Sequence, residues 1–560
     1  MSVSLDYIQI EHENREKRMI EKKIVKSILL IAMLLSICGV IYIILAYSKN
    51  YFHSDCAGFL FLAKEQLAQK KMFPDGFHYT TDIFFLMPNI TMIPFLAVLN
   101  NELFAHELGI LLYMIIICVM IFKLFWDVKK AAVIIVTFFL FPLSWVVIDM
   151  FFSQGAYLGE CLFKLLLLIA IQYLFAVGEK ESVKKIYVVC MLYLATGFLV
   201  NYAVVRRIAT DMLPIFFAFS AMIIIREGIS VKGILKQKKL LLYSGCTIII
   251  IGISGIHYAL LCNRLGFSSP SLNIGIVDSG SFYQNILNFP ALVLELLGWT
   301  STSSLFSIST FKTCGVLVYI IISQIIIPVF LLIKVCSISN KFMQFLVLYV
   351  NLSNFITFFV MTASGTMESR YYLPIYFNNL LLFGLVGKWI LDDKYEVLKA
   401  VPVIGILILT VCIHGIYIYS VPDEWKQDIN LFDPEVNRQF YEFLLANDLT
   451  YGYATFWNAY PITVLSNEEV FVVAHDAGKP TVPFYFNANV TDDYRYYAVS
   501  EDYYDPELHT GRCFVLVLTG ETIPEQYYQL AEQTLTYEGF TILIYGKNIN
   551  EYPELAIVGQ

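Results

Sequence analysis

The sequence predicts a polytopic α-helical membrane protein with a C-terminal α/β domain, and three observations support this fold class. Hydrophobic residues make up 58% of the 560 residues and charged residues only 15%, a balance that soluble globular and disordered chains do not have. Apolar runs long enough to cross a bilayer recur between residues 24 and 420. Residues 421–560 instead alternate short β-rich and helical stretches.

The charge of the chain is divided between these two parts. The formal net charge is −8, from 38 basic and 46 acidic side chains. Residues 421–560 contain 22 acidic and 6 basic residues, a net charge of −16, so residues 1–420 carry +8. Nucleic acid is not expected as a partner, because the basic part is embedded in lipid and the acidic domain would repel a polyanion. The 11 cysteines form no CxxC or Cys/His pattern of a structural zinc site.

Eleven apolar runs have the length of membrane spans. They are Ile24–Tyr47, Glu107–Phe125, Ala131–Ile148, Leu158–Gly178, Ile186–Val205, Ala209–Ile225, Leu240–Cys262, Cys314–Ile333, Phe342–Met361, Tyr371–Leu391 and Ala400–Ser420. The first run is too long for a signal-peptide core, and basic residues precede it. Residues 1–23 are therefore expected to be a cytoplasmic N-terminal tail.

A further run, Ile83–Leu99, is short and contains Pro88 and Pro94, so it is expected not to cross. All the basic connectors then fall on the cytoplasmic side. They are Lys129–Lys130, Lys180–Lys185, Arg226–Lys239, Lys334–Lys341 and Lys388–Lys399. This topology gives a transmembrane domain over residues 24–420, with an outer loop 48–106 that contains interfacial helices.

Residues 421–560 are then expected to be an exocytoplasmic α/β domain. The expected strands are Ala454–Trp457, Val470–Ala474, Cys513–Leu518 and Thr541–Tyr545, and the expected helices are Pro434–Ala446 and Pro524–Glu532. The chain has no internal repeat or inverted hydropathy symmetry, which disfavours a transporter.

Polar residues gather where the first spans meet the outer face. His53 and Asp55 directly follow the first run and precede an amphipathic segment, Gly58–Lys70, expected to lie in the interface with its apolar face down. Asp55 is either the N-cap of this helix, the commoner use of Asp, or a reactive acid at headgroup depth. Tyr79 and Asp82 follow a Pro-Asp-Gly turn, in a segment typical of either a sugar-facing lining or an interfacial aromatic belt.

Charged residues also stand at the outer ends of later spans. Asp149 is at the membrane edge, where an acid either has a partner or is solvated at the helix end. Glu368 and Arg370 lie in the turn Thr362–Arg370, where the arginine either binds a lipid phosphate in a bidentate contact or acts as a snorkelling anchor.

Two further sets of charged residues are unusual for their positions. Arg206 and Arg207 form an outer cation pair against the positive-inside tendency. Lys164 lies inside a leucine-rich span, and Glu160, one turn away, is its expected partner.

The order of these features resembles the GT-C class of integral-membrane glycosyltransferases over residues 20–420. The stretch Arg370-Tyr371-Tyr372-Leu373-Pro374 resembles the start of a late span in its protein O-mannosyltransferase and aminoarabinose-transferase branch. The tail segment Tyr451–Tyr460 is similar to tails of bacterial members and implies no chemistry.

This resemblance implies transfer of a sugar from a polyprenyl-phosphate-linked donor to a glycan, lipid or protein acceptor on the outer face, with inversion. Asp55 would be the general base, and Arg370 with Arg206 or Arg207 would hold the lipid phosphate. His53, Tyr79 and Asp82 would contact substrate. Asp149 and Glu368 match acidic positions that hold a divalent metal in some members, whereas other members need none, so a metal cofactor stays open.

Three other functions remain compatible with the sequence. A polysaccharide polymerase or ligase also uses lipid-linked glycans, but it is expected to have a large late outer loop and no tail domain of this size. A transporter or flippase would place charged groups at mid-membrane depth, for which the candidates are Lys164, His257, Glu295 and His414. The last alternative is an inactive membrane scaffold whose tail binds glycans.

Overall fold

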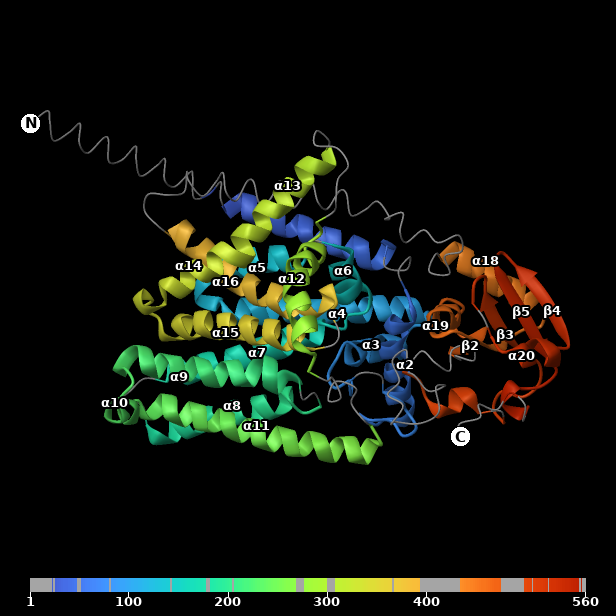
Figure 1. Cartoon of the computed structure of the whole chain (residues 1–560), viewed down its shortest axis with the longest axis horizontal. Coiled ribbons are helices and arrows are strands. Elements are labelled where there is room, and N and C mark those ends of the chain that lie inside the picture. The colour runs from blue at the N-terminus through green and yellow to red at the C-terminus, as the bar shows by residue number, and fades with distance from the viewer. Residues whose placement is uncertain are drawn as a thin grey trace, which may run out of the picture.

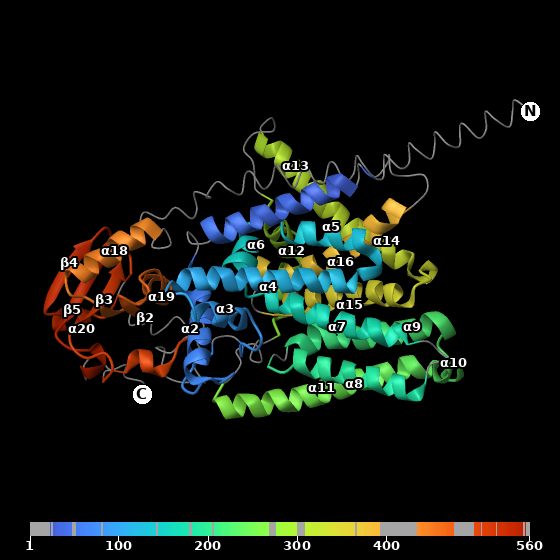
Figure 2. The ribbon, with the colours of Figure 1, turned by 180° about the vertical axis from the view of Figure 1, so that it is seen from behind.

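A bundle of long helices carries a small sheet domain at one end in the computed structural model (Figures 1 and 2). The structure describes residues 23, 26–47, 52–79, 82–141, 144–177, 182–203, 206–267, 276–299, 308–364, 367–392, 434–474, 498–505, 507–521, 523–552 and 555. The expected tail 1–23, apart from Lys23, the run Ala400–Ser420 and the expected boundary at residues 420–421 lie outside these ranges.

Eight helices among the described residues are long and apolar enough to cross a membrane. They are Lys26–Ala46, Glu102–Leu124 (α4), Leu158–Ala176 (α7), Val183–Val200 (α8), Ile208–Glu227 (η5 and α9), Lys238–Leu265 (α11), Cys314–Ile333 (the end of α13, η7 and α14) and Lys341–Ala363 (α15). Another long helix, α16 (Leu373–Asp392), replaces the expected run Tyr371–Leu391. The chain is therefore a helical membrane protein with several spans, although the described helices do not establish the expected eleven.

Shorter elements join and flank these helices. They are η1 (Ile43–Tyr47), η3 (Trp126–Val128), α10 (Val231–Lys236), α12 (Ser279–Leu296), α13 (Ile308–Ile320), η7 (Ile321–Ile326), α14 (Ile327–Ile333), η8 (Val335–Ser337) and η9 (Ser369–Tyr372). The spanning segment Ile208–Glu227 itself consists of η5 (Ile208–Met212) and α9 (Leu213–Glu227). Polar N-caps start several helices, as Asn101 does for α4 by accepting a hydrogen bond from the Phe104 amide at 2.7 Å.

The expected span Ala131–Ile148 is not a single helix. Its first part is α5 (Lys129–Phe139), and its end belongs to the short α6 (Trp145–Val147) and the π-helical turn η4 (Ile148–Ser153). Pro142 follows α5 in the sequence, and a proline cannot donate the backbone hydrogen bond that would continue a helix. Asp149 therefore lies in a separate turn.

The run Ile83–Leu99 contains only one helix, α3 (Asn89–Leu96), with Pro94 inside it. Its 8 residues extend about 12 Å, far less than the roughly 30 Å of a bilayer core. The prediction that this run does not form an uninterrupted crossing helix is confirmed.

The expected interfacial helix Gly58–Lys70 is part of α2 (Ser54–Gln69), and protein covers more of this helix than the expected apolar face. Its residues from Cys56 to Ala63 are all buried. The helix packs against α3 and against α19 (Phe456–Leu465) of the C-terminal domain, and it runs across the ends of the bundle helices (Figures 1 and 2). An apolar stretch without polar interruption suits burial between two protein surfaces.

The C-terminal domain has a five-stranded sheet of order β2-β1-β3-β5-β4. Its strands are β1 (Tyr451–Ala454), β2 (Phe471–Ala474), β3 (Cys513–Leu518), β4 (Gln533–Tyr537) and β5 (Phe540–Tyr545). The strands β2, β1 and β3 are mutually parallel, whereas β3, β5 and β4 pair antiparallel. Its other elements are α18 (Pro434–Ala446), α20 (Glu525–Leu530) and the one-turn helices η11 (Glu501–Tyr504) and η12 (Ile549–Glu551).

Several expected elements of this domain are confirmed, and one is wrong. The bounds of β3 and α18 agree with the sequence prediction, and β2, β5 and α20 lie within the predicted segments or overlap them. The expected strand Ala454–Trp457 is instead the end of β1 and the start of α19. Aromatic and β-branched residues, with Pro461 inside the helix, give α19 the composition of a strand.

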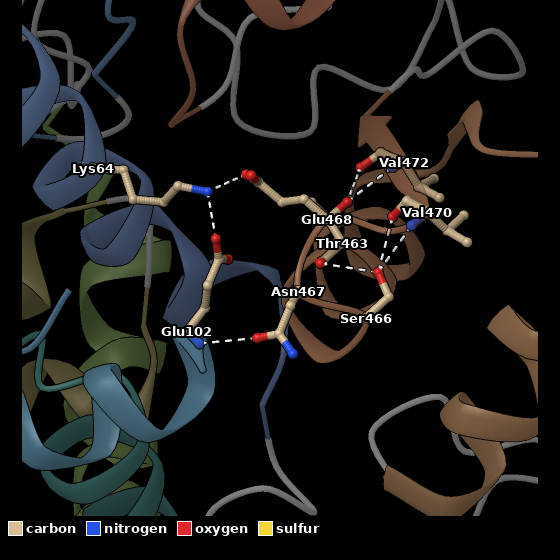
Figure 3. A network of polar contacts seen from close by, with 8 residues as sticks. All are labelled: Lys64, Glu102, Thr463, Ser466, Asn467, Glu468, Val470 and Val472. Carbon is tan, nitrogen blue, oxygen red and sulfur yellow. Dashed lines mark hydrogen bonds and ion pairs between the residues drawn. The ribbon is translucent and has the colours of Figure 1, made fainter. Parts of the chain in front are cut away.

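Salt bridges and ring contacts join the C-terminal domain to α2 and α4. Lys64 pairs with Glu102 at 2.5 Å and with Glu468 of the domain, and Asn467 Oδ1 accepts a hydrogen bond from the Glu102 amide at 3.0 Å (Figure 3). The ring of Phe61 lies 5.1 Å from that of Tyr460, edge to face. The domain is thus held directly over α2.

Replacing Lys64 by Met should loosen this junction. The change leaves the carboxylates of Glu102 and Glu468 facing each other without a cation, which we expect to cost about 1–3 kcal/mol. Hydrogen exchange should then quicken in α19 relative to β3 and β5. Lys71→Met, which removes an exposed pair with Asp75, is the matched control and should cost at most about 0.5 kcal/mol. Unchanged exchange in α19 would contradict the prediction.

Candidate functional site

Charged residues from several segments gather at the end of the bundle next to the C-terminal domain. Successive long helices alternate in direction, so the starts of α4, α7, α9 and α16 lie at this one end (Figure 1). The described basic connectors lie at the opposite end, as α10 does in Figure 1. The residues gathered near the domain are His53, Asp55, Asp82, Asp149, Glu160, Arg206, Glu368 and Arg370.

The buried His53 and the half-buried Asp149 form the centre of this site. His53 Nε2 lies 2.8 Å from Asp149 Oδ1, so the partner expected for Asp149 is a histidine at the start of α2. Gln154 Nε2 donates to both Asp149 oxygens at 3.1 Å. The carboxylate is therefore held by two side chains from segments about 100 residues apart.

The turn after η4 depends on Gly155. This residue has a φ of 72°, and a Cβ built on it would lie 2.5 Å from Ile110 Cδ1 and 2.9 Å from Pro88 Cγ. Both the backbone angle and the close packing exclude a larger residue. Gly155 thus allows Gln154 to reach back to Asp149.

The variant Gly155→Ala should be less stable by about 2–3 kcal/mol, because it combines backbone strain with overpacking. Gly266→Ala is the control, since Gly266 has a φ of 61° but nothing within 4 Å of the added methyl group. Its cost should be about 1 kcal/mol, from the backbone alone. Denaturant unfolding in detergent checks both values, and equal losses would contradict the packing argument.

Asp55 lies beside this centre and is not the N-cap of α2. The N-cap position is occupied by His53, whose side chain makes no capping hydrogen bond, and Asp55 is the second helical residue. Asp55 lies within electrostatic range of His53, Asp149, Arg370 and Glu368. Burial raises the pKa of Asp55, and the charges of His53 and Arg370 lower it by less. The carboxylate is therefore a stronger base than an ordinary aspartate.

Arg370 lies in η9, the turn before α16, and interacts electrostatically with Asp55. Its Nε lies 2.5 Å from Glu368 Oε2, and its guanidinium lies 5.5 Å from the ring centre of Tyr371. A quarter of the side chain is exposed. Arg370 is thus a partly exposed cation within electrostatic range of Asp55.

A second charged group lies at the start of α7. Arg206 pairs with Glu160 and, at 3.3 Å, with Asp82. Tyr157 lies within electrostatic range of this group and of Arg370, so it links the two groups. Burial raises the pKa of Asp82, and Arg206 lowers it by less.

Arg207 and Tyr79 are placed differently from the other candidates. Arg207 is buried, donates to the Val200 carbonyl at 2.9 Å and lies 4.1 Å from the Phe163 ring centre. Of the expected cation pair, only Arg206 therefore has a substantially exposed side chain. Tyr79 is buried among aromatic rings, including Phe77 at 5.1 Å.

The expected pairing of Lys164 with Glu160 is wrong. Lys164 instead lies 3.2 Å from Asp211 and donates to Asn378 at 2.7 Å. Tyr349 also donates to Asp211, at 2.6 Å. Amide and hydroxyl side chains continue this network between α15, α16 and η7, namely Ser353, Asn354, Asn379 and Gln324.

A small cavity connects this network with the charged groups. It lies between η4, α7 and the start of α16. Its lining consists of Phe151, Tyr157, Glu160, Cys161, Lys164, Leu373, Pro374 and Phe377. Lys164 therefore contributes to the same hollow as Tyr157 and Glu160.

One group of described residues has the geometry to hold a metal ion. Donor atoms of His53, Cys56 and Asp149 all lie within 4.8 Å of one another. Nitrogen, sulfur and carboxylate donors suit Zn²⁺ better than Mg²⁺ or Ca²⁺. Glu368, the other acid matched to a metal position, pairs with Arg370 instead. A bound Zn²⁺ would polarise an oxygen of the substrate.

Sequence reasoning missed several members of the site. Gln154, Tyr157 and Cys56 carried no distinctive pattern, and Glu160 was expected to pair with Lys164. A signal for Gln154 existed in Gly155, because a glycine after a polar residue marks a tight turn.

Comparisons with protein-family models, with characterised proteins and with solved structures find no match for this chain. The contacts described above are therefore what supports the proposal that follows.

Proposed function

We propose that this protein transfers a sugar from a polyprenyl-phosphate-linked donor to a cell-envelope acceptor on the outer face of the membrane. The observation that carries the proposal is the position of Asp55. It is a half-buried carboxylate with a raised pKa, in no capping role, within electrostatic range of both His53 and Asp149 and of the cation of Arg370. A base and a phosphate-binding cation at one end of a membrane bundle are what such a transfer needs.

In the proposed reaction the acceptor hydroxyl attacks the anomeric carbon of the donor and inverts it. Asp55 takes the hydroxyl proton, and the bond between the anomeric carbon and the phosphate oxygen breaks through an oxocarbenium-like state. Arg370 and Arg206 stabilise the negative charge on the departing lipid phosphate. The His53–Asp149 pair forms the centre of the site beside Asp55. The carboxylates of Asp82 and Glu160 orient Arg206.

The proposed topology places the N-terminus in the cytoplasm and the C-terminal domain outside. The described basic connectors lie at the end of the bundle away from this acidic domain, as the positive-inside tendency requires. A GT-C-like arrangement of eleven spans, including α16 and Ala400–Ser420, is part of this proposal. A lipid-linked donor cannot leave the bilayer, so a site at the ends of the helices meets it at the membrane surface.

Mass spectrometry of cell-envelope glycans with and without the protein tests this function. Loss of one sugar substituent would support a transferase, whereas loss of polymer length would indicate a polymerase or ligase. Unchanged glycans would contradict both.

A flippase or transporter of lipid-linked glycans is a second candidate, because Lys164 and Asp211 form an ion pair inside the bundle. Flipping of a labelled polyprenyl-phosphate sugar in vesicles separates the two functions. A flippase would keep this activity after Asp55→Asn, and a transferase would show none.

A further inference from the structure

The C-terminal domain places an aromatic side chain at the candidate site. Helix α19 begins where it meets the start of α2, and Ser54 Oγ donates to the carbonyl of Phe456. The indole of the next residue, Trp457, lies 5.7 Å from the imidazole of His53 at an angle of 61°. The domain therefore touches the residue that pairs with Asp149.

Trp457 is exposed, whereas Phe456 and Asn458 on either side of it are half-buried. Its relative exposure is 38%, whereas Ala459 and Tyr460 are fully buried. One side of the indole meets His53 and the ring of Phe456, which lies 5.1 Å away. Part of the indole surface stays exposed, and the contact with His53 places it beside the candidate site.

The backbone that carries Trp457 is fixed by a local hydrogen-bond network. Glu521 accepts from Thr455 Oγ1 at 2.8 Å and from Asn458 Nδ2 at 3.3 Å, and its other oxygen accepts from the Leu518 amide at 2.8 Å. This network ties the first turn of α19 to the end of β3. The salt bridges of Lys64 hold the other end of α19 against α2 and α4 (Figure 3).

We propose that Trp457 is the surface on which a sugar ring of the acceptor stacks, so that the acceptor is a glycan. This inference rests on the proposed transferase function and specifies its acceptor. A flat indole packs well against the C–H face of a pyranose ring. A carboxylate and an amide nearby, in Asp149 and Gln154, suit a ligand rich in hydroxyl groups.

The position of Trp457 favours a glycan over a lipid acceptor. Trp457 belongs to the C-terminal domain, which the proposed topology places in water, so a molecule that stacks on it would reach Asp55 from the domain side. A lipid acceptor would come from the bundle side, where Tyr157 and Lys164 line the cavity. The domain then has a defined role: it supplies one wall of the acceptor site.

Direct binding of soluble glycans to the full-length protein in nanodiscs tests the inference. The probes are tetrasaccharides of N-acetylglucosamine, mannose, galactose and glucose, measured by saturation-transfer NMR and by titration. At least one should bind the wild type. Trp457→Ala should weaken that binding by about tenfold and Trp457→Phe by only about threefold. Tyr528→Ala is the control, since Tyr528 is similarly exposed on α20 and should leave binding unchanged.

Two results would overturn the inference: equal binding by Trp457→Ala and the wild type, or no binding of any tetrasaccharide to the wild type. Trp457→Phe keeps a ring on α19, so it separates loss of stacking from loss of folding. The Asp55→Asn variant tests the transferase proposal separately from the binding of the acceptor. It should bind the glycan normally and fail to transfer sugar. Normal transfer by Asp55→Asn would refute the transferase, whatever the binding results.

Discussion

Replacing Asp55 by Asn should lower the rate of sugar transfer by about a hundredfold to ten-thousandfold, the usual effect of losing a positioned base. An amide has nearly the shape of a carboxylate but cannot accept the proton of the acceptor. The structure places Asp55 in the first turn of α2 and not at its N-cap, so the helix does not need this side chain as a cap. The fold should therefore survive the change.

The measurement is the sugar content of envelope glycans in cells that carry only the variant, together with its amount in the membrane. Asp75→Asn is the control, because Asp75 is an exposed acid in the same loop and pairs with Lys71. It should leave transfer unchanged. An Asp55→Asn protein that is stably inserted and transfers sugar at the normal rate would disprove the mechanism.

Replacing Lys164 by Met should destabilise the bundle by about 3–5 kcal/mol, the typical cost of leaving one member of a buried ion pair alone. The side chains of Lys164 and Asp211 are only 3% and 5% exposed. Without the lysine, Asp211 keeps a hydrogen bond from Tyr349 but no cation. Unfolding of the purified protein by added SDS in mixed micelles measures the loss.

The double variant Lys164→Met with Asp211→Asn should recover much of this stability, because no isolated charge remains. Lys123→Met serves as the control, since Lys123 is exposed and contacts only the face of Tyr173 at 5.7 Å among the described residues. Its loss should be below about 1 kcal/mol. A single Lys164→Met variant as stable as the wild type would contradict the prediction.

Most long helices could be predicted from sequence because length and hydropathy are local properties. Three segments are apolar enough to be recognised as membrane spans without knowledge of what packs against them: residues 102–124, 158–176 and 341–363. The prediction of a single helix over Ala131–Ile148 was wrong, because it followed hydropathy alone and overlooked Pro142, a helix-stop signal inside this apolar run. The surroundings of α2 could not be predicted either. Its sequence shows that the helix is apolar, but not that another domain covers it.

The candidate site was predictable in its location but not in its pairs. Charged residues near the outer ends of the predicted spans indicated a site at one end of the bundle. In the structure, Asp149 and Arg370 lie within electrostatic range of Asp55 there. The pairs depend on contacts between distant segments. Glu160 and Lys164 are four residues apart, yet Glu160 pairs with Arg206 and Lys164 with Asp211, each from another segment of the chain.

The Lys164–Asp211 pair also has a consequence for biogenesis. Ribosomes deliver α7 before the segment that contains Asp211, so for some time Lys164 has no acid on a neighbouring helix. A lone lysine at the centre of a helix costs about 2.5–3.5 kcal/mol on the scale measured for insertion by the translocon. The apolar residues beside Lys164, at about −0.3 to −0.6 kcal/mol each on the same scale, roughly balance this cost, so α7 alone is only marginally stable in lipid. We therefore expect α7 to enter the lipid together with α8 and α9, as one unit released from the translocon when Asp211 arrives.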